Sequence, residues 1–205
     1  MTREEFQQAM DRHAQTIEQM KQAAHELHDS VNQRYGKNHP YGFHLDMVAE
    51  AVIRYGHDAC AAEEDVLPLL FGAYFHDSIE DARLTYNDVK RTATQWMDDR
   101  QALMAAEIVY ALTNDKGRTR AERAGDHYYE GIRLTPYAPM VKLADRLANT
   151  SYSFSTDDGT NNQMKKVYAE EMPHFLEAID AKSSDRRYAL PQEMLDALET
   201  LMRDS

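Results

Sequence analysis

Apolar residues recur along this chain with the spacing of helices. In the first 29 residues, apolar or small side chains fall at Phe6, Met10, Ile17, Met20 and Ala24. This spacing leaves long polar faces and predicts one amphipathic helix over residues 3–29. The stretch 33–42, QRYGKNHPYG, concentrates Gly, Asn and Pro and predicts an irregular loop. A second helix is predicted from His44 to about Tyr55, with Gly56 as its C-terminal cap.

A nearly continuous apolar run, VLPLLFGA at 66–73, predicts a buried central helix from Asp65, as its N-cap, to about Ile79. Pro68 is compatible with this helix because it lies in the first turn. Further helices are predicted at 85–97, 100–112, 119–132, from Pro136 or Pro139 through 149, at 161–181 and at 189–203, with a loop at 113–119. Two of them begin with capping-box pairs, Thr85 with Asp88 and Thr119 with Glu122. Alternating β-branched runs and hairpin turns are absent, so no strand is predicted.

Composition supports an all-α fold in a single domain, 1–205. Of 205 residues, 42% are hydrophobic, but only 8 are Gly and 6 are Pro. The net charge of −12 disfavours DNA and membrane surfaces as partners, so an anionic ligand would need local cations or a metal. Cys60 is the lone cysteine, which argues against a disulfide framework and favours a reducing, cytoplasmic compartment. No apolar run approaches 18 residues and no signal-peptide pattern opens the chain, so no membrane span is expected.

The segment YFHDSIED, 74–81, places a histidine and three carboxylates directly after the buried run. If the helix continues, His76 and Glu80 share one face, while Asp77 and Asp81 share the next. Carboxylates held together repel one another as water is excluded, unless a cation or a proton compensates. A divalent metal is the simplest compensation. For an isolated His-Asp pair, the ordinary interpretation is a solvated acidic turn before the next helix.

Two further residues favour the metal. His44 lies at the start of an apolar-faced helix, and Asp145 is embedded in the apolar stretch VKLADRLAN, 141–149. An aspartate in such a stretch is costly unless it is paired, and a structural salt bridge to Lys142 or Arg146 is the alternative. The candidate ligands are His44, His76, Asp77 and Asp145. This mixed set of nitrogen and oxygen atoms suits Mn, Fe, Zn or Mg with positions open for water and substrate.

The order of a His, a His-Asp pair and a distant Asp resembles the HD superfamily of metal-dependent phosphohydrolases. HDSIED, 76–81, is similar to the HDxxED signature of the alarmone hydrolases of the RelA/SpoT type. Other segments resemble that family in the right order: HPYGFH at 39–44, LTNDK at 112–116, VKLADRLAN at 141–149 and KVYAEEMPHF at 166–175. The likeness covers about 20–180 and is nearest to the small, hydrolase-only members. It implies a compact HD-domain helical bundle.

The resemblance also implies roles for the residues. Mn²⁺, or another divalent transition metal, would be held by His44, His76, Asp77 and Asp145. Glu80 and Asp81 would orient and deprotonate a water, whose attack releases pyrophosphate from the 3′ position of ppGpp or pppGpp, the alarmones of the stringent response. Substrate contacts are expected from Asn149, Arg34, Lys37, Tyr41, Lys142 and Arg146. An oligomer is compatible with this assignment.

The chain also departs from the family pattern. Tyr35 stands where the family commonly has an Arg nine residues before the first ligand, and Ser151 replaces an Arg two residues after the pocket Asn. Lys165 and Lys166 either help to bind anions or are surface charges. The lost cations leave open a phosphatase acting on another nucleotide 2′- or 3′-phosphate, such as NADPH or a nucleoside monophosphate. A non-catalytic nucleotide- or partner-binding module with a structural metal is a third reading, but it has no need for both Glu80 and Asp81.

Other candidate groups have simpler interpretations. His25 and His28, three apart on the first helix, are expected to be solvated or helix-capping rather than half a metal site, because no third ligand of matching spacing is visible. Several aromatic residues at helical spacing are expected to belong to the core: Trp96, Tyr128, Tyr129 and Tyr152.

Overall fold

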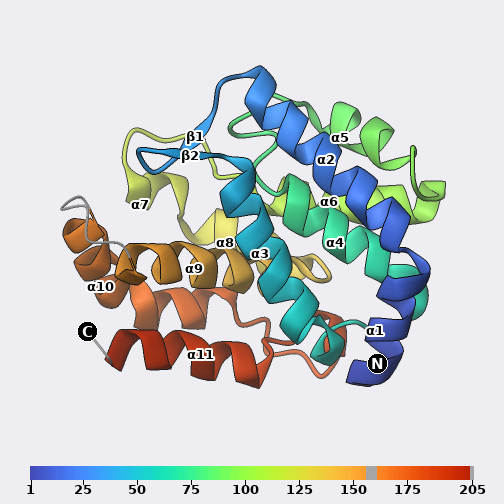
Figure 1. The fold of residues 1–205 in the computed structure, drawn as a ribbon. Coiled ribbons are helices and arrows are strands. Elements are labelled where there is room, and N and C mark those ends of the chain that lie inside the picture. The colour runs from blue at the N-terminus through green and yellow to red at the C-terminus, as the bar shows by residue number, and fades with distance from the viewer. Residues whose placement is uncertain (156–160, 204–205) are drawn as a thin grey trace.

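The computed structural model describes residues 1–155 and 161–203, and the regular elements in these ranges are almost all helices (Figure 1). The α-helices are α1 (Arg3–Arg12), α2 (Ala14–Ser30), α3 (Gly42–Tyr55), α4 (Val66–Phe75), α5 (Tyr86–Ala93), α6 (Asp99–Leu112), α7 (Arg120–Arg123), α8 (Asp126–Leu134), α9 (Ala138–Ser155), α10 (Asn161–Ile179) and α11 (Gln192–Arg203). Short 3₁₀ helices lie at Gly56–Asp58, Glu63–Asp65 and Arg186–Tyr188. The all-α prediction is confirmed. Within the described ranges, no helix is both long and apolar enough to cross a bilayer.

Helices α3, α4 and α9 form the centre of the molecule. Every residue of α4, VLPLLFGAYF, is buried, because this helix is apolar on all sides and other helices surround it. α3 packs against both α4 and α9, while α6 packs against α4 and is covered by α5. α10 and α11 cover α9 on the other side (Figure 1). The helices that carry the candidate ligands therefore meet in the core.

The N-terminal segment is two helices rather than one. The predicted helix at 3–29 is broken at His13, where φ is −103° and ψ is 10°. The break lets α1 bury Phe6, whose ring approaches Gly56 so closely that a Cβ there would lie 2.9 Å from Phe6 Cζ. Gly56 caps α3 as predicted, but in a right-handed conformation with φ −63°. A close approach, not a left-handed turn, is therefore what requires glycine at this position.

The central helix is shorter than predicted. α4 ends at Phe75 instead of Ile79, and the residues that follow form turns. Asp65 occupies the N-cap position without a capping bond from its side chain, which instead accepts a hydrogen bond from Tyr137 Oη at 2.6 Å. The predicted helix at 119–132 is likewise divided into α7 and α8, and α5 ends at Ala93. Turns, and not one helical face, therefore position Asp77, Glu80 and Asp81.

Both capping boxes are present, at Thr85 with Asp88 and at Thr119 with Glu122. In contrast, the expected absence of strands is wrong for the loop at 33–42. Strands β1 (Arg34–Tyr35) and β2 (His39–Pro40) pair antiparallel there. Gly36 turns the hairpin with φ +57°, a conformation that favours glycine. This hairpin lies over one end of α3 and brings Tyr35 to the site described below.

Candidate metal centre and active site

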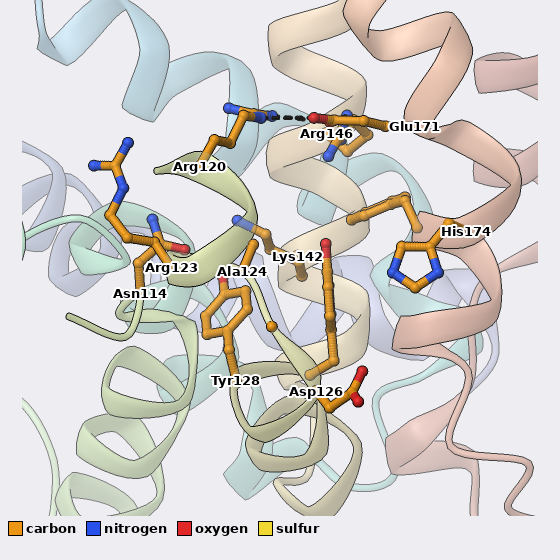
Figure 2. Close-up of a pocket in the computed structure, with 13 residues that line it drawn as sticks. Asn114, Arg120, Arg123, Ala124, Asp126, Tyr128, Lys142, Arg146, Glu171 and His174 are labelled. Atoms are coloured by element: carbon orange, nitrogen blue, oxygen red, sulfur yellow. Dashed lines mark hydrogen bonds and ion pairs between the residues drawn. The ribbon is translucent and has the colours of Figure 1, made fainter. Parts of the chain in front are cut away.

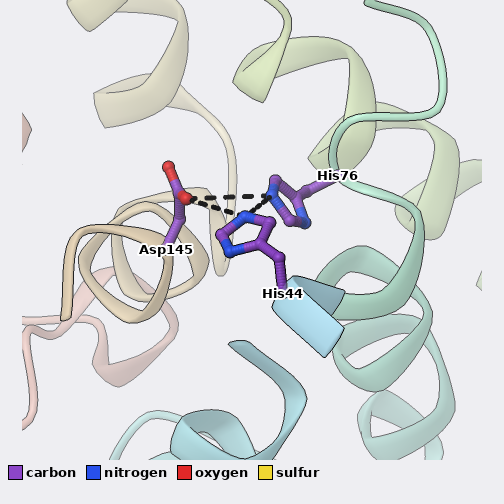
Figure 3. A group of neighbouring side chains, drawn as sticks. All are labelled: His44, His76 and Asp145. Carbon is purple, nitrogen blue, oxygen red and sulfur yellow. Dashed lines mark hydrogen bonds and ion pairs between the residues drawn. The ribbon is translucent and has the colours of Figure 1, made fainter. Parts of the chain in front are cut away.

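Three side chains from three parts of the fold converge on one point (Figure 3). His44 comes from the first turn of α3, His76 follows the last residue of α4, and Asp145 lies in the middle of α9. His44 Nε2 lies 3.2 Å from His76 Nε2 and 3.3 Å from Asp145 Oδ1. His76 Nε2 lies 3.8 Å from Asp145 Oδ1. Both imidazoles are buried, so these atoms face one another rather than bulk solvent.

Asp77 completes the group. Its Oδ2 lies 2.8 Å from His76 Nε2 and 3.7 Å from His44 Nε2. The same oxygen accepts a hydrogen bond from Tyr41 Oη at 2.5 Å. Tyr41 was expected to contact substrate. The structure places it in the site, where its hydroxyl contacts the candidate ligand Asp77. All four predicted ligands are therefore brought together, which neither helix periodicity nor spacing alone could establish.

The donor set fits a divalent cation. Two imidazole nitrogens and two carboxylate oxygens face the same small space, and all four atoms can donate lone pairs to a cation once the imidazoles are neutral. Burial disfavours charge on His76, but Asp77 and Asp145 outweigh burial and raise its pKa to about 9. Burial likewise opposes ionisation of both carboxylates. The imidazoles near Asp77, and Lys142 together with the imidazoles near Asp145, nevertheless lower the two carboxyl pKa values.

The carboxylate of Asp145 is fixed from two sides. Lys142 Nζ lies 3.0 Å from Oδ2, and Asn149 Nδ2 donates to Oδ1 at 2.5 Å and to the backbone oxygen of Asp145 at 3.1 Å. The salt bridge to Lys142 that was considered as an alternative to a metal site does exist. It engages Oδ2 and leaves Oδ1 facing the histidines, so the two interpretations are compatible.

Glu80 and Asp81 lie close to the four candidate ligands and are held by amide side chains. Both oxygens of Glu80 accept from Asn114 Nδ2 at 3.0 Å, and Asp81 Oδ2 accepts from Gln33 Nε2 at 3.1 Å. Burial, followed by the nearby charge of Asp77, raises the pKa of Asp81. A carboxylate with a raised pKa is a better proton acceptor, which is the property that a general base needs.

Two adjoining cavities are present beside the four candidate ligands. The first, of about 270 Å³, is lined by Tyr41, His44, Asp77, Glu80, Asp81, Leu112, Asn114, Arg120, Lys142, Asp145, Arg146, Asn149 and Tyr168. The second, of about 540 Å³, is shown in Figure 2 and shares Asn114, Arg120, Lys142 and Arg146 with the first. Arg123 also lines the larger cavity. The shared wall is thus rich in cations, in a chain whose net charge is −12.

The predicted substrate residues are placed unequally. Lys142, Asn149 and Tyr41 line the smaller cavity, as does Arg146, which is buried with its guanidinium 3.0 Å from Glu171 and 4.3 Å from the ring centre of Phe175. Arg34 and Lys37 are exposed on the β1–β2 hairpin and are not among the described residues that line either cavity. A substrate contact from these two residues stays a prediction. Lys165 Nζ lies 5.5 Å from the ring centre of Phe154, and Lys166 is exposed.

The sequence did not identify several residues that shape this site. Arg120 projects from α7 to the shared wall, where Glu171 binds it through two contacts of 2.7 and 3.0 Å. Its only signal was the basic run KGRTRAER at 116–123, directly after the loop LTNDK that already resembled the family. Asn114 lay within that loop, but its contact with Glu80 joins segments 34 residues apart and has no local signature.

The remaining histidine and aromatic predictions had mixed outcomes. His28 is fully buried and stacks on Tyr41 with ring centres 4.6 Å apart, so the expectation of a solvated or capping side chain is wrong for this residue. His25 Nε2 instead lies 2.9 Å from Asp46 Oδ1. Tyr128 and Tyr129 are buried and Trp96 packs against the core, as predicted.

Comparisons with known proteins agree with the geometry. No protein-family model matches the chain. A curated relative, the guanosine-3′,5′-bis(diphosphate) 3′-pyrophosphohydrolase MESH1 of Danio rerio, is 25% identical over 125 residues, which are 60% of this chain and 65% of the relative. The match therefore spans slightly less than two thirds of the relative's length.

A solved structure matches over a longer range. It is described as a metazoan ortholog of SpoT that hydrolyzes ppGpp and plays a role in starvation responses. The TM-score is 0.59 at 18% identity, with 92% of this chain and 94% of the other covered. At this identity the match establishes a shared fold. The resemblance predicted from the motifs is confirmed: this chain has the helical HD-domain fold, and its sequence is similar to that of a ppGpp hydrolase.

Proposed function

We propose that this chain is a metal-dependent phosphohydrolase that removes pyrophosphate from the 3′ position of ppGpp or pppGpp. The observation that carries the proposal is the convergence of His44, His76 and Asp145, with Asp77 beside them, at a cavity edged by two further carboxylates. The similarity to a pyrophosphohydrolase with this substrate supports the choice of reaction. We assign Mn²⁺ as the ion and the cytoplasm as the compartment, which the lone, buried Cys60 fits.

A divalent ion held by these four residues would lower the pKa of a water and polarise a phosphoryl oxygen. Asp81 then accepts the proton of the attacking water, because its carboxyl pKa is raised by burial and by Asp77. Glu80 orients the water from the cavity rim, and Asn114 holds Glu80 in place. Attack at the phosphorus bound to the 3′ oxygen breaks that P–O bond. The products are pyrophosphate and GDP, or GTP from pppGpp.

The substrate phosphates require positive charge, which the shared wall of the two cavities supplies. Lys142 lies within this wall beside Asp145, and Arg120 reaches it from α7. Arg123 lines the adjoining cavity and adds a further cation. Guanidinium groups bind phosphate through paired N–H donors, so both arginines are suited to a polyphosphate that extends away from the ligands.

A second candidate function is a phosphatase acting on another nucleotide 2′- or 3′-phosphate. The observation that favours it is the loss of two cations from the family pattern, since Tyr35 and Ser151 stand where arginines are common. A smaller phosphate group needs fewer cations. The presence of Arg120 and Arg123 at the cavities compensates for this loss and keeps the pyrophosphohydrolase as the first proposal.

The test is a substrate panel. Purified protein with Mn²⁺ is assayed against ppGpp, NADPH and nucleoside monophosphates. The control is the same protein treated with a metal chelator. We expect pyrophosphate release from ppGpp, none from the others, and no activity after chelation. Inorganic phosphate released from NADPH or a monophosphate, with ppGpp unchanged, would favour the second function. If none turns over while Mn²⁺ is bound, the non-catalytic binding module is the correct reading.

A further inference from the structure

The two histidines of the centre are oriented by different means. His76 Nδ1 donates to the backbone oxygen of Ala73 at 2.9 Å, the kind of hydrogen bond that usually fixes a metal-binding imidazole. His44 Nδ1 is buried and has no hydrogen-bond partner among the described residues. On the side of the ring that faces away from the centre, packing therefore takes the place of a hydrogen bond.

Two aromatic rings provide that packing. Tyr35 stacks on His44 with ring centres 4.7 Å apart and an angle of 15° between the planes. Tyr41 meets His44 edge-on, at 5.5 Å and 68°. A flat contact on one face and a tilted contact beside it restrict rotation of the imidazole about its side-chain bonds. Tyr35 itself is held in the β1–β2 hairpin opposite His39.

The hydroxyl of Tyr35 reaches a second member of the centre. A carboxylate can only accept, so Asn149 must present its NH₂ group to Asp145. The carbonyl oxygen of the Asn149 amide then points the other way and accepts from Tyr35 Oη at 2.9 Å. Tyr35 thereby fixes the direction of the amide that holds Asp145.

We propose that Tyr35 is a positioning residue of the metal centre, holding His44 through its ring and Asp145 through Asn149. Tyr35 is not among the described residues that line the cavities, so its position suits contact with the candidate ligands rather than with substrate. It occupies a position where the resembled family commonly has an arginine, so this chain braces its site with an aromatic ring at that point. The inference rests on the proposed function, because it treats His44 and Asp145 as ligands.

Direct measurement of Mn²⁺ affinity by calorimetry tests the proposal without an activity assay. Tyr35→Phe keeps the ring and removes the hydroxyl, and we expect roughly tenfold weaker binding. Tyr35→Leu removes both, and we expect binding weakened by up to roughly 100-fold. Tyr110→Phe, at an exposed tyrosine on α6, is the matched control and should bind Mn²⁺ like the wild type. Helical circular dichroism and the thermal midpoint without metal establish that each variant is folded.

A double-mutant cycle separates the two routes. In an Asn149→Ala background, Tyr35→Phe should cause no further loss of affinity, because the hydroxyl acts through the amide. Tyr35→Leu should still weaken binding there, because its stack on His44 is independent of Asn149. Wild-type affinity in folded Tyr35→Leu overturns the inference while the proposed function stands. If the wild-type protein itself binds no Mn²⁺, the proposed function fails, and this inference fails with it.

Discussion

Asp77 and Asp81 are four residues apart and have opposite electrostatic characters. The imidazoles of His76 and His44 outweigh burial at Asp77 and lower its carboxyl pKa. At Asp81, burial and the charge of Asp77 dominate and raise the pKa instead. In the proposed mechanism, Asp77 is therefore the carboxylate kept ionised as a ligand, and Asp81 is the one suited to accept a proton. Asp77 and Asp81 of the segment HDSIED are therefore chemically distinct acids.

This division of roles predicts different outcomes for neighbouring substitutions. Asp81→Asn and Glu80→Gln should each lower kcat by roughly 10²–10⁴-fold while Mn²⁺ affinity is kept, because they remove a proton acceptor and a water-orienting group. Asp77→Ala should lose Mn²⁺ binding as well as activity. Steady-state kinetics combined with calorimetry distinguishes the two classes. Full activity in Glu80→Gln would show that the role given to this residue is incorrect.

His28 predicts a dependence of stability on pH. Burial lowers its pKa from 6.5 to about 4, so between these values the unfolded chain binds a proton that the folded chain does not. Folding stability therefore falls as the pH is lowered through this window, by roughly 3 kcal/mol from this residue. His28→Phe, which keeps a ring against Tyr41, should lose that part of the pH dependence.

The measurement for His28 is urea unfolding of metal-free protein at a series of pH values between 7 and 4. The stability of His28→Phe relative to the wild type should rise steadily as the pH falls. His127→Gln is the control. Because His127 is exposed, the stability of this variant relative to the wild type should change far less with pH. Parallel pH profiles for wild type and His28→Phe would contradict the assignment of a buried, neutral imidazole.

At the scale of elements, two helical glycines have opposite surroundings. A Cβ on Gly72 of α4 would lie 2.6 Å from Ile108 Cγ2 of α6, whereas one on Gly131 of α8 would meet nothing within 4 Å. Gly72→Ala should therefore destabilise the protein by about 1–3 kcal/mol through overpacking. Gly131→Ala should stabilise it by about 0.5–1 kcal/mol, because alanine favours the helix. Chemical denaturation of both variants checks the pair, and a shift of the same sign in each would refute the packing described for α4 and α6.

Glu171 joins three helices. From α10 it binds Arg120 of α7 and Arg146 of α9. Burial opposes its ionisation, but the hydrogen bonds from the two arginines outweigh burial and lower its pKa below 4.5. Its contribution to stability is therefore fully present above about pH 4.5 and is lost as the pH falls through the lower pKa of the folded state.

Glu171→Gln should cost about 1–3 kcal/mol at neutral pH, because it leaves the buried guanidinium of Arg146 without its anionic partner. The matched control is Glu193→Gln. Glu193 pairs with Arg3 at 2.8 Å, but both side chains are more than half exposed, at 57% and 60%, so the loss should stay under about 1 kcal/mol. Equal losses in the two variants, measured by denaturant unfolding, would mean that burial does not strengthen the Glu171 pair.

Local signals predicted where helices begin, and tertiary contacts decided where they end. The capping boxes at Thr85 and Thr119 could be predicted because each depends on two residues only three positions apart. The break at His13 could not be predicted from local sequence. It accompanies the packing of Phe6 against Gly56, which lies about fifty residues away in the chain. The β1–β2 hairpin also lacked alternating apolar residues, because its strands have only two residues each.

The candidate site divides in the same way. Its four candidate ligands could be predicted because histidines and buried aspartates are chemically conspicuous in a helical sequence and match a known spacing. The residues that support the site acquire their contacts only through folding: Tyr35 contacts Asn149 beside Asp145, Asn114 holds Glu80, and Gln33 holds Asp81. Arg120 was similarly one of several cations in a basic run until α7 placed it beside Lys142.

At the scale of the whole molecule, charge and architecture are linked. The chain has a net charge of −12, yet cations collect at the wall where two cavities meet. The proposed polyanionic substrate would thus be repelled by the net charge of the chain and attracted at this wall, which would focus binding beside the candidate centre. The candidate ligands beside that wall come from α3, the turn after α4, and α9, which pack together, so binding of an ion there would act on the core of the fold.

This arrangement predicts that the ion stabilises the entire protein. The candidate ligands come from α3, the turn after α4, and α9, and they converge only in the folded chain. Mn²⁺ at 100 times its Kd should therefore add about 2.7 kcal/mol to the free energy of unfolding. For a chain of this size, the thermal midpoint should rise by about 5–10 °C and fall again on chelation. Calorimetric scans of wild type and Asp77→Ala, with and without Mn²⁺, provide the test. An equal rise in both proteins would place the bound ion elsewhere, because Asp77→Ala lacks a ligand at the centre and should show no shift.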